Sequence, residues 1–197
     1  LPTADLLAHE GYGILPLASR NCAGQPVTLG YREAEDVQAM LTFARSQPGV
    51  DWVGALGFSA GGAAVLRAAA REPGLQAVIA EGQYSNLRHE VINDPARPLS
   101  LQWQFHRAVL FTLWLQIGVR PAHLSPLDDL RQLGQPVLLI HGEREAANNQ
   151  ASEQCLAANS PKTCWVVPGA GHGDYQQVQP EEYKQRVLQF FDQARRP

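Results

Sequence analysis

The sequence Gly57-Phe58-Ser59-Ala60-Gly61 is the feature that most constrains how this 197-residue chain can fold. It directly follows the apolar run Val53 to Leu56 and precedes the helix-forming run Ala63 to Arg71. A serine flanked in this way, where a strand turns sharply into a helix, forms a nucleophile elbow with an exposed hydroxyl oxygen. Glycines at both flanks suit the turn, because a side chain there would collide with the neighbouring strand or helix. The alternative, a chance match at a helix start, does not explain the strand before it.

Strand-like and helix-like patterns alternate along the whole chain, which indicates an α/β fold with a mostly parallel sheet and flanking helices. Short apolar runs predict strands at 14–17, 53–58, 77–80, 136–140 and 163–167. Helical spacing of apolar residues predicts helices at 2–10, 33–46 and 60–71, and a closing helix that begins at Pro180. The length fits a single domain over residues 1–197.

Residues 86–124 interrupt this alternation with a segment rich in aromatic side chains, namely Trp103, Phe105, Phe111 and Trp114. In α/β sheets the functional site lies at the carboxyl ends of the strands, so an insertion at this point would lie over it. One interpretation is a small helical lid that lines an apolar acyl pocket. The other is a segment packed against the edge of the sheet, and the sequence favours neither.

Charge and apolar content exclude several classes of protein. The net charge of −3, with scattered Lys and Arg residues, argues against a nucleic-acid partner. The most apolar stretch, Leu101 to Val119, contains too many polar residues to span a membrane. No signal peptide is evident, although the chain begins at Leu1 rather than Met. We expect a cytoplasmic protein, with a membrane-anchored or secreted form as the alternative.

The three cysteines, Cys22, Cys155 and Cys164, have neither the number nor the spacing of a disulfide framework or a zinc site. We therefore expect ordinary reduced thiols and no metal. A bridge between Cys155 and Cys164 is the alternative, but nothing in their spacing demands it.

A serine nucleophile needs a base, and the base needs an orienting acid. After a nucleophile elbow the expected chain order is Ser, acid, His. The histidine that fits is His172, in the glycine-rich loop Gly169 to Gly173 after the last predicted strand. His141 precedes the acid and is interpreted as a structural histidine at a strand end. The remaining histidines, expected at the surface or in the lid, are His9, His89, His106 and His123.

The acid is expected in the loop His141-Gly142-Glu143-Arg144-Glu145, which follows a predicted strand. Either Glu143 or Glu145 could hydrogen-bond the imidazole of His172. The alternative for each is a solvated surface carboxylate, the usual fate of a loop glutamate. Asp174 is a weaker candidate, because a residue only two positions after His172 would rarely place its carboxylate against the same imidazole ring.

With these residues in place, the chain resembles the α/β-hydrolase superfamily, in particular bacterial serine hydrolases of the acyl-peptidase-like, thioesterase-like and esterase-like groups. The resemblance covers nearly the whole chain and is carried by HEGYGILPL, LGYREAEDVQAM, LGFSAGGAAVLRAAA, LQAVIAEGQYSNL, SPLDDL, PVLLIHGERE and VPGAGHGD. It implies the α/β-hydrolase fold and a mechanism without a metal or organic cofactor. It also favours Glu145 over Glu143, since the acid of such proteins commonly occupies the fifth place of an H-G-x-x-D pattern.

The chain departs from that family in two places. Relatives usually carry Asp-x-Arg-x-His-Gly after the strand at 14–17, where this chain reads Ala18-Ser19-Arg20-Asn21-Cys22-Ala23. The family's strand before the first helix, whose loop lends one oxyanion donor, would precede residue 1; the other donor is the backbone N–H of Ala60. We therefore expect residues 1–197 to be the carboxyl-terminal portion of a longer hydrolase, in which 14–17 and 53–58 are not paired with each other and any membrane anchor lies upstream.

Together these residues predict a serine hydrolase that acts on an ester, thioester or amide bond of a small-molecule acyl substrate. A carboxylesterase for a small or medium apolar acyl group is favoured by the aromatic insertion. The alternatives are an acyl-peptidase-like enzyme and a non-catalytic hydrolase-like protein that binds a ligand or partner. The residues that bind the substrate are not identified by the sequence.

Overall fold

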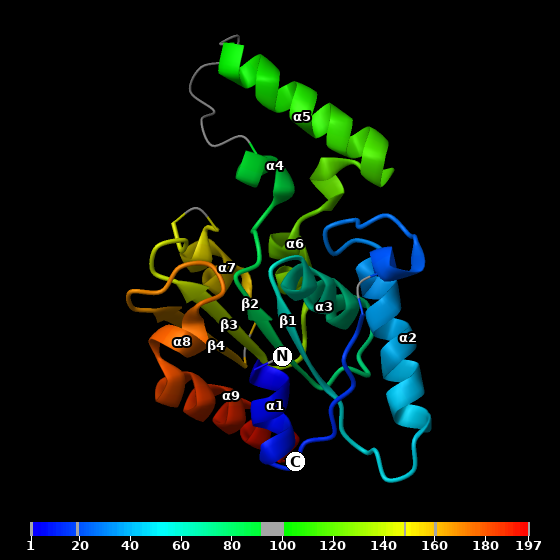
Figure 1. Cartoon of the computed structure of the whole chain (residues 1–197), viewed down its shortest axis with the longest axis vertical. Helices are drawn as coiled ribbons and strands as arrows, with labels where there is room; N and C mark the ends of the chain where they lie inside the picture. Colours follow the sequence, from blue (N-terminus) through cyan, green and yellow to red (C-terminus); the bar gives the residue numbers. More distant parts are fainter. Residues whose placement is uncertain (1, 19, 92–100, 148, 160, 197) are drawn as a thin grey trace.

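The computed structural model describes residues 2–18, 20–91, 101–147, 149–159 and 161–196. In these ranges the strands form one parallel sheet in the order β1-β2-β3-β4 (Figure 1). Their bounds are Gly54–Phe58 for β1, Ala77–Glu81 for β2, Val137–Gly142 for β3 and Lys162–Val167 for β4. The expected α/β class with a parallel sheet and flanking helices is confirmed.

Helices cover both faces of the sheet (Figure 1). One face packs against α2 (Glu33–Ser46), α3 (Ala60–Arg71) and α6 (Pro126–Gln132). The other packs against α1 (Pro2–His9), α8 (Tyr175–Val178) and α9 (Pro180–Arg195). A further helix, α7 (Ala151–Ala157), contacts β4 and α6. Strands enclosed in this way need apolar residues on both sides, which is why β2 and β3 lack polar alternation.

The helices that position the site are held by two kinds of apolar contact. Helix α3 is buried from Gly62 to Ala69, and its many alanines let its backbone lie close to β1 and β2. Helix α9 instead buries one stripe of larger side chains, Tyr183, Val187 and Phe191, at a spacing of four residues. Burial of such a side chain contributes roughly 1.5–3 kcal/mol, so α9 is fixed firmly against the sheet.

The expected strand at 14–17 is wrong, because residues 12–18 form neither helix nor strand. A strand exists through hydrogen bonds to a neighbouring strand, and within the described ranges β1 pairs with β2 alone. Residues 14–17 are therefore not paired with β1. Their apolar side chains are correspondingly exposed, as Ile14, Leu15 and Leu17 show.

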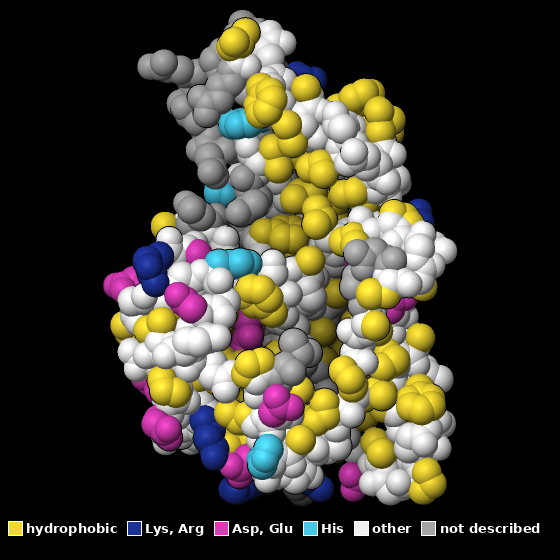
Figure 2. All heavy atoms as spheres, in the orientation of Figure 1, with side chains coloured by type: hydrophobic (Ala, Val, Ile, Leu, Met, Phe, Trp, Pro, Cys, Tyr) yellow, Lys and Arg dark blue, Asp and Glu magenta, His cyan; other side chains and the backbone are white. Residues whose placement is uncertain are grey.

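The insertion at 86–124 contains α4 (Leu87–Val91), α5 (Leu101–Ile117) and the 3-10 helix η2 (Pro121–His123); 92–100 lie outside the described residues. Figure 1 shows α4 and α5 beyond the carboxyl ends of the strands. Apolar side chains gather on the surface of α5 (Figure 2), and the large ones that are exposed include Leu101, Phe105, Phe111, Trp114 and Leu115. The side chain of Trp103 is outside the described part. Among the helices described, none is both long and apolar enough to cross a membrane.

Cys155 on α7 and Cys164 on β4 form a disulfide, with their Cα atoms 6.1 Å apart. The expectation of reduced thiols is therefore wrong for these two residues, while Cys22 is free and exposed. The pairing depends on tertiary structure, because α7 lies beside β4. Spacing along the sequence does not contain that information.

Candidate active site

Ser59 lies at the turn between β1 and α3, in a backbone conformation that non-glycine residues seldom adopt. Its φ is 53° and its ψ is −119°. Such conformations cost about 1–3 kcal/mol and persist where the surroundings enforce them. Here the Ser59 N–H donates to the carbonyl oxygen of Glu81 at 2.7 Å, which ties the turn to the end of β2. The serine side chain is thereby presented at the carboxyl end of β1.

The two glycines of the motif have different roles. A Cβ atom at Gly57 would collide with the backbone of Gly61 and would lie 2.8 Å from the nitrogen of Gly62. A Cβ atom at Gly61 would meet nothing within 4 Å. The expectation that a side chain would collide at both flanks is therefore confirmed for Gly57 and wrong for Gly61.

Ala60 is the first residue of α3. The first backbone N–H groups of a helix have no acceptor within it, and the helix dipole adds partial positive charge there. The N–H of Ala60 thus directly follows Ser59 at a position suited to stabilising a negatively charged oxygen.

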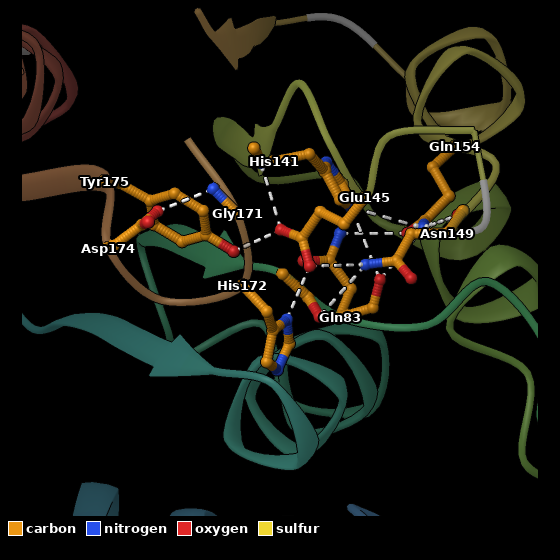
Figure 3. Close-up of polar contacts among 11 residues, drawn as sticks. Gln83, His141, Glu145, Asn149, Gln154, Gly171, His172, Asp174 and Tyr175 are labelled. Carbon is orange, nitrogen blue, oxygen red and sulfur yellow. Dashed lines mark hydrogen bonds and ion pairs between the residues drawn. The ribbon is translucent and has the colours of Figure 1, made fainter. Parts of the chain in front are cut away.

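His172 lies in the loop after β4 and makes two contacts that fix its ring. Its Nδ1 is 2.5 Å from Oε2 of Glu145. Its ring packs against Phe58, the residue before Ser59, with centroids 4.7 Å apart. In Figure 3 the ring extends from Glu145 toward the turn between β1 and α3, so Nε2 points away from the carboxylate. The side chain of His172 is 48% exposed.

Glu145 follows β3 in a turn and is 8% exposed. Its Oε1 accepts the N–H of Gly142 at 3.0 Å and the hydroxyl of Tyr175. Its Oε2 accepts Nδ2 of Asn149 at 3.3 Å and is the oxygen that faces His172. A carboxylate held by several donors in a buried position keeps one orientation, and hydrogen bonds to it are stronger than bonds between neutral groups.

The other two carboxylates considered from the sequence are directed elsewhere. Oε2 of Glu143 accepts the N–H of Gly169 at 2.8 Å. Asp174 accepts the N–H of Gly171 at 2.6 Å and pairs with Arg144 at 3.3 Å. Of the three candidates, Glu145 is the one that contacts His172.

His141 is buried on β3, behind the acid loop. Its Nε2 lies 3.3 Å from the carbonyl oxygen of Gln83 and 3.5 Å from Nε2 of Gln154. Burial lowers the pKa of His141 below its usual value, which favours the neutral ring. Its contacts are those of a structural group beneath the loop that carries Glu145.

Three residues of the site were not identified from the sequence: Phe58, Asn149 and Tyr175. Asn149 follows Glu145 by four residues, and its N–H donates to the Glu145 carbonyl at 2.9 Å, a helix-like spacing that could have suggested contact. Phe58 and Tyr175 meet the site through tertiary packing, which leaves no local signal.

The arrangement contains the parts of nucleophilic catalysis: a strained serine, a half-exposed imidazole and a fixed carboxylate. A carboxylate on Nδ1 selects the tautomer in which that nitrogen carries the proton, so Nε2 can accept another. Over the ranges described, no three His, Cys, Asp or Glu side chains cluster in a way that could hold a metal ion.

No model of a protein family matches the sequence, and a search of curated proteins finds no match. Solved structures do match. An esterase of Pyrococcus furiosus is similar over 98% of this chain and 75% of its own, with a TM-score of 0.71 and 24% identity. The α/β hydrolase GrgF of Penicillium sp. is similar over 82% of this chain and 71% of its own, with a TM-score of 0.59 and 16% identity.

A third similar structure is the proline iminopeptidase of Mycobacterium smegmatis, over 82% of this chain and 70% of its own, with a TM-score of 0.55 and 19% identity. At such identities the likeness concerns the arrangement of the backbone. One fold can carry many activities, so function must be argued from the residues of the site.

Proposed function

Because the chain has the α/β-hydrolase fold, we propose that it is a serine hydrolase that cleaves a carboxylic ester. Ser59 is the nucleophile, His172 the general base and acid, and Glu145 the group that orients His172. The observation that carries this proposal is the 2.5 Å contact between Glu145 and His172, made by an imidazole that also packs on the residue before Ser59. Three loops distant in the sequence meet there in the chain order expected after a nucleophile elbow.

The reaction follows from these roles. Ser59 Oγ attacks the carbonyl carbon of the ester while Nε2 of His172 takes the hydroxyl proton. Negative charge on the carbonyl oxygen is stabilised by the N–H of Ala60 at the start of α3. Collapse of this intermediate breaks the bond to the alcohol, which leaves with the proton from His172. A water molecule then repeats the sequence on the acyl-enzyme, releases the carboxylic acid and restores Ser59.

Glu145 supports both halves of this cycle. Its Oε2 keeps the Nδ1 proton of His172 in place and stabilises the imidazolium that forms during each transfer. Because Glu145 is 8% exposed, water competes little for these contacts.

The favoured substrate is an ester with a small or medium apolar acyl group, and the insertion at 86–124 is the proposed lid. In support, α4 and α5 lie beyond the carboxyl ends of the strands, the side on which Ser59 and His172 also lie (Figure 1). The exposed side chains of α5, among them Phe111 and Trp114, offer apolar surface for an acyl chain.

The direct test is covalent labelling of the full-length protein with a fluorophosphonate probe. We expect the native protein and Ser46→Ala, which alters an exposed serine on α2, to be labelled, and Ser59→Ala to remain unlabelled. Glu145→Gln and His172→Ala are expected to lower kcat on a p-nitrophenyl ester by roughly 10³- to 10⁶-fold. Absence of labelling in the folded native protein would instead favour a non-catalytic protein that binds a ligand or partner.

A second assay separates an esterase from an acyl-peptidase-like enzyme. Turnover of p-nitrophenyl butyrate is compared with turnover of an aminoacyl p-nitroanilide. We expect hydrolysis of the ester, with little on the anilide. A preference for the anilide would favour the peptidase, a class to which one of the structurally similar proteins belongs.

A further inference from the structure

Glu145 is longer than aspartate by one methylene group, so its carboxylate has an additional rotatable bond. Each such bond adds rotamers that must be restricted before the group can hold a fixed position. In this structure the restriction comes from donors on both oxygens. Oε2 faces His172 and Asn149, while Oε1 faces Tyr175 and the N–H of Gly142.

We propose that Tyr175 is a positioning residue for the acid: its hydroxyl holds Oε1 of Glu145, so that Oε2 stays directed at His172. This inference rests on the proposed function, in which Glu145 orients His172. The hydroxyl of Tyr175 is the side-chain donor on Oε1, and Figure 3 shows it on the opposite side of the carboxylate from Asn149. Without it, the backbone N–H of Gly142 alone would restrain that oxygen among the contacts described above.

The position of Tyr175 is itself well determined. It is the first residue of α8 and is 2% exposed. It follows His172 by only three residues along the chain. Its ring packs against Phe58 with centroids 6.3 Å apart. One segment of chain therefore supplies both the imidazole and the group that aligns its acid.

Gly82, directly after β2, provides the space for this arrangement. A Cβ atom there would collide with the hydroxyl oxygen of Tyr175 and would lie 3.1 Å from Cε1 and Nδ1 of His172. Its φ of +58° is also one that most side chains disfavour. The absence of a side chain at Gly82 lets both rings approach Glu145 together.

The electrostatic environment keeps Tyr175 in its donating form. Burial raises the pKa of the phenol well above its usual value, and the negative charge of Glu145 raises it further. A buried phenol without an acceptor would cost about 1–3 kcal/mol, so the hydroxyl and the carboxylate constrain each other.

Tyr183 provides a matched control within the same chain. It is 1% exposed, and its hydroxyl donates to another buried carboxyl group, that of Glu81, at 2.6 Å. Tyr183→Phe and Tyr175→Phe therefore remove the same atom from similar surroundings. Of these two tyrosines, Tyr175 is the one that contacts Glu145.

The experiment compares the two variants by proton NMR and by kinetics in the full-length protein. The Nδ1 proton of His172 shared with Glu145 is expected far downfield, and its loss in Glu145→Gln assigns it. We expect Tyr175→Phe to shift or broaden this resonance and to lower kcat on p-nitrophenyl butyrate about tenfold or more with little change in KM. Tyr183→Phe is expected to leave the resonance and kcat unchanged, although this variant is also expected to lose stability.

An equal response of the two variants would overturn the proposal, as would a loss of stability in Tyr175→Phe with the resonance unmoved. The resonance does not depend on turnover, so it tests Tyr175 even if the proposed esterase activity fails. A double-mutant cycle adds a second measurement. Because the carboxylate of aspartate lies one methylene group nearer the backbone, it is not expected to contact His172 and Tyr175 together, and we expect Tyr175→Phe to cost much less kcat in a Glu145→Asp background. Full additivity of the two losses would also count against the role of Tyr175.

Discussion

The ring of Phe58 packs against the imidazole of His172, with the two planes inclined by 43° and the centroids 4.7 Å apart. Phe58 precedes Ser59 at the end of β1, and His172 follows β4, the strand at the opposite edge of the described sheet. Gly173 makes the approach possible, since a Cβ atom there would lie 2.8 Å from Cζ of Phe58. The contact is thus a direct link between the serine turn and the histidine loop.

Phe58→Ala should lower activity more than stability. Phe58 is 42% exposed, so its truncation is expected to cost less than about 2 kcal/mol of unfolding free energy. The imidazole of His172 would lose the surface that restrains it, and we expect kcat to fall about tenfold. Kinetics on p-nitrophenyl butyrate and thermal unfolding measure the two effects. Phe43→Ala, at a 53% exposed position on α2, serves as the control, and a kcat within twofold of native in Phe58→Ala would contradict the role of the contact.

The serine turn should tolerate a methyl group at one flanking glycine only. Gly57→Ala places Cβ against the backbone of Gly61, which cannot move without displacing α3, and we expect a loss of about 3 kcal/mol or more. Gly61→Ala meets open space on a helix and should be neutral or slightly stabilising. Urea unfolding of both variants tests this. Similar stabilities would show that the turn is less tightly packed than the contacts imply.

Local patterns in the sequence predicted the elements that surround the site. The helices at 33–46 and 60–71 have the predicted bounds, and β1 to β4 begin and end within two residues of the predicted strands. Apolar periodicity carries this information because each of these segments buries a face determined by its own residues. The Ser, Glu and His candidates could be ordered along the chain for the same reason, since each follows a recognisable strand.

The sequence-based predictions that were wrong or missing concern features that depend on contact with another segment of the chain. The apolar run at 14–17 lacks a partner to pair with, so its strand does not form in the described part. The Cys155–Cys164 bridge depends on α7 lying beside β4, and the hydrogen bond from Tyr175 to Glu145 depends on two loops meeting. None of these relationships has a period or a motif along the chain, so the sequence alone provided no reason to choose them.

Removal of the disulfide should destabilise the protein without changing the chemistry of the site. Cross-linking residues nine apart restricts the unfolded chain, and a loop of this length is expected to contribute about 2–3 kcal/mol. The double variant Cys155→Ser with Cys164→Ser should lose this amount in urea unfolding, and native protein under a reducing agent should lose a similar amount. Cys22→Ser, at a free and exposed cysteine, should be neutral. Unchanged stability of the double variant would mean that the bridge does not form in solution.

Glu81 should make the protein less stable as the pH rises toward neutrality. Burial raises the pKa of Glu81 from 4.5 to about 7, against the smaller opposing effect of the hydroxyl of Tyr183. The folded state therefore retains a proton that the unfolded chain releases above pH 4.5. The stabilisation of the folded state by this retained proton is fully present below pH 4.5 and is lost as the pH rises to about 7. Burial also raises the pKa of Asp129, to about 6, which acts in the same direction over a lower range.

Glu81→Gln removes the ionisable group and keeps an oxygen that can accept from Tyr183. At about 1.4 kcal/mol per pKa unit, the variant is expected to be more stable than native by up to about 3 kcal/mol at pH 8, and of similar stability at pH 4. Urea unfolding from pH 4 to pH 8 measures the difference. In Asp129→Asn, the control, the decline between pH 6 and pH 7 should persist, because Glu81 still titrates there. Equal pH dependence of native and Glu81→Gln would mean that Glu81 titrates at the same pH in the folded and the unfolded protein.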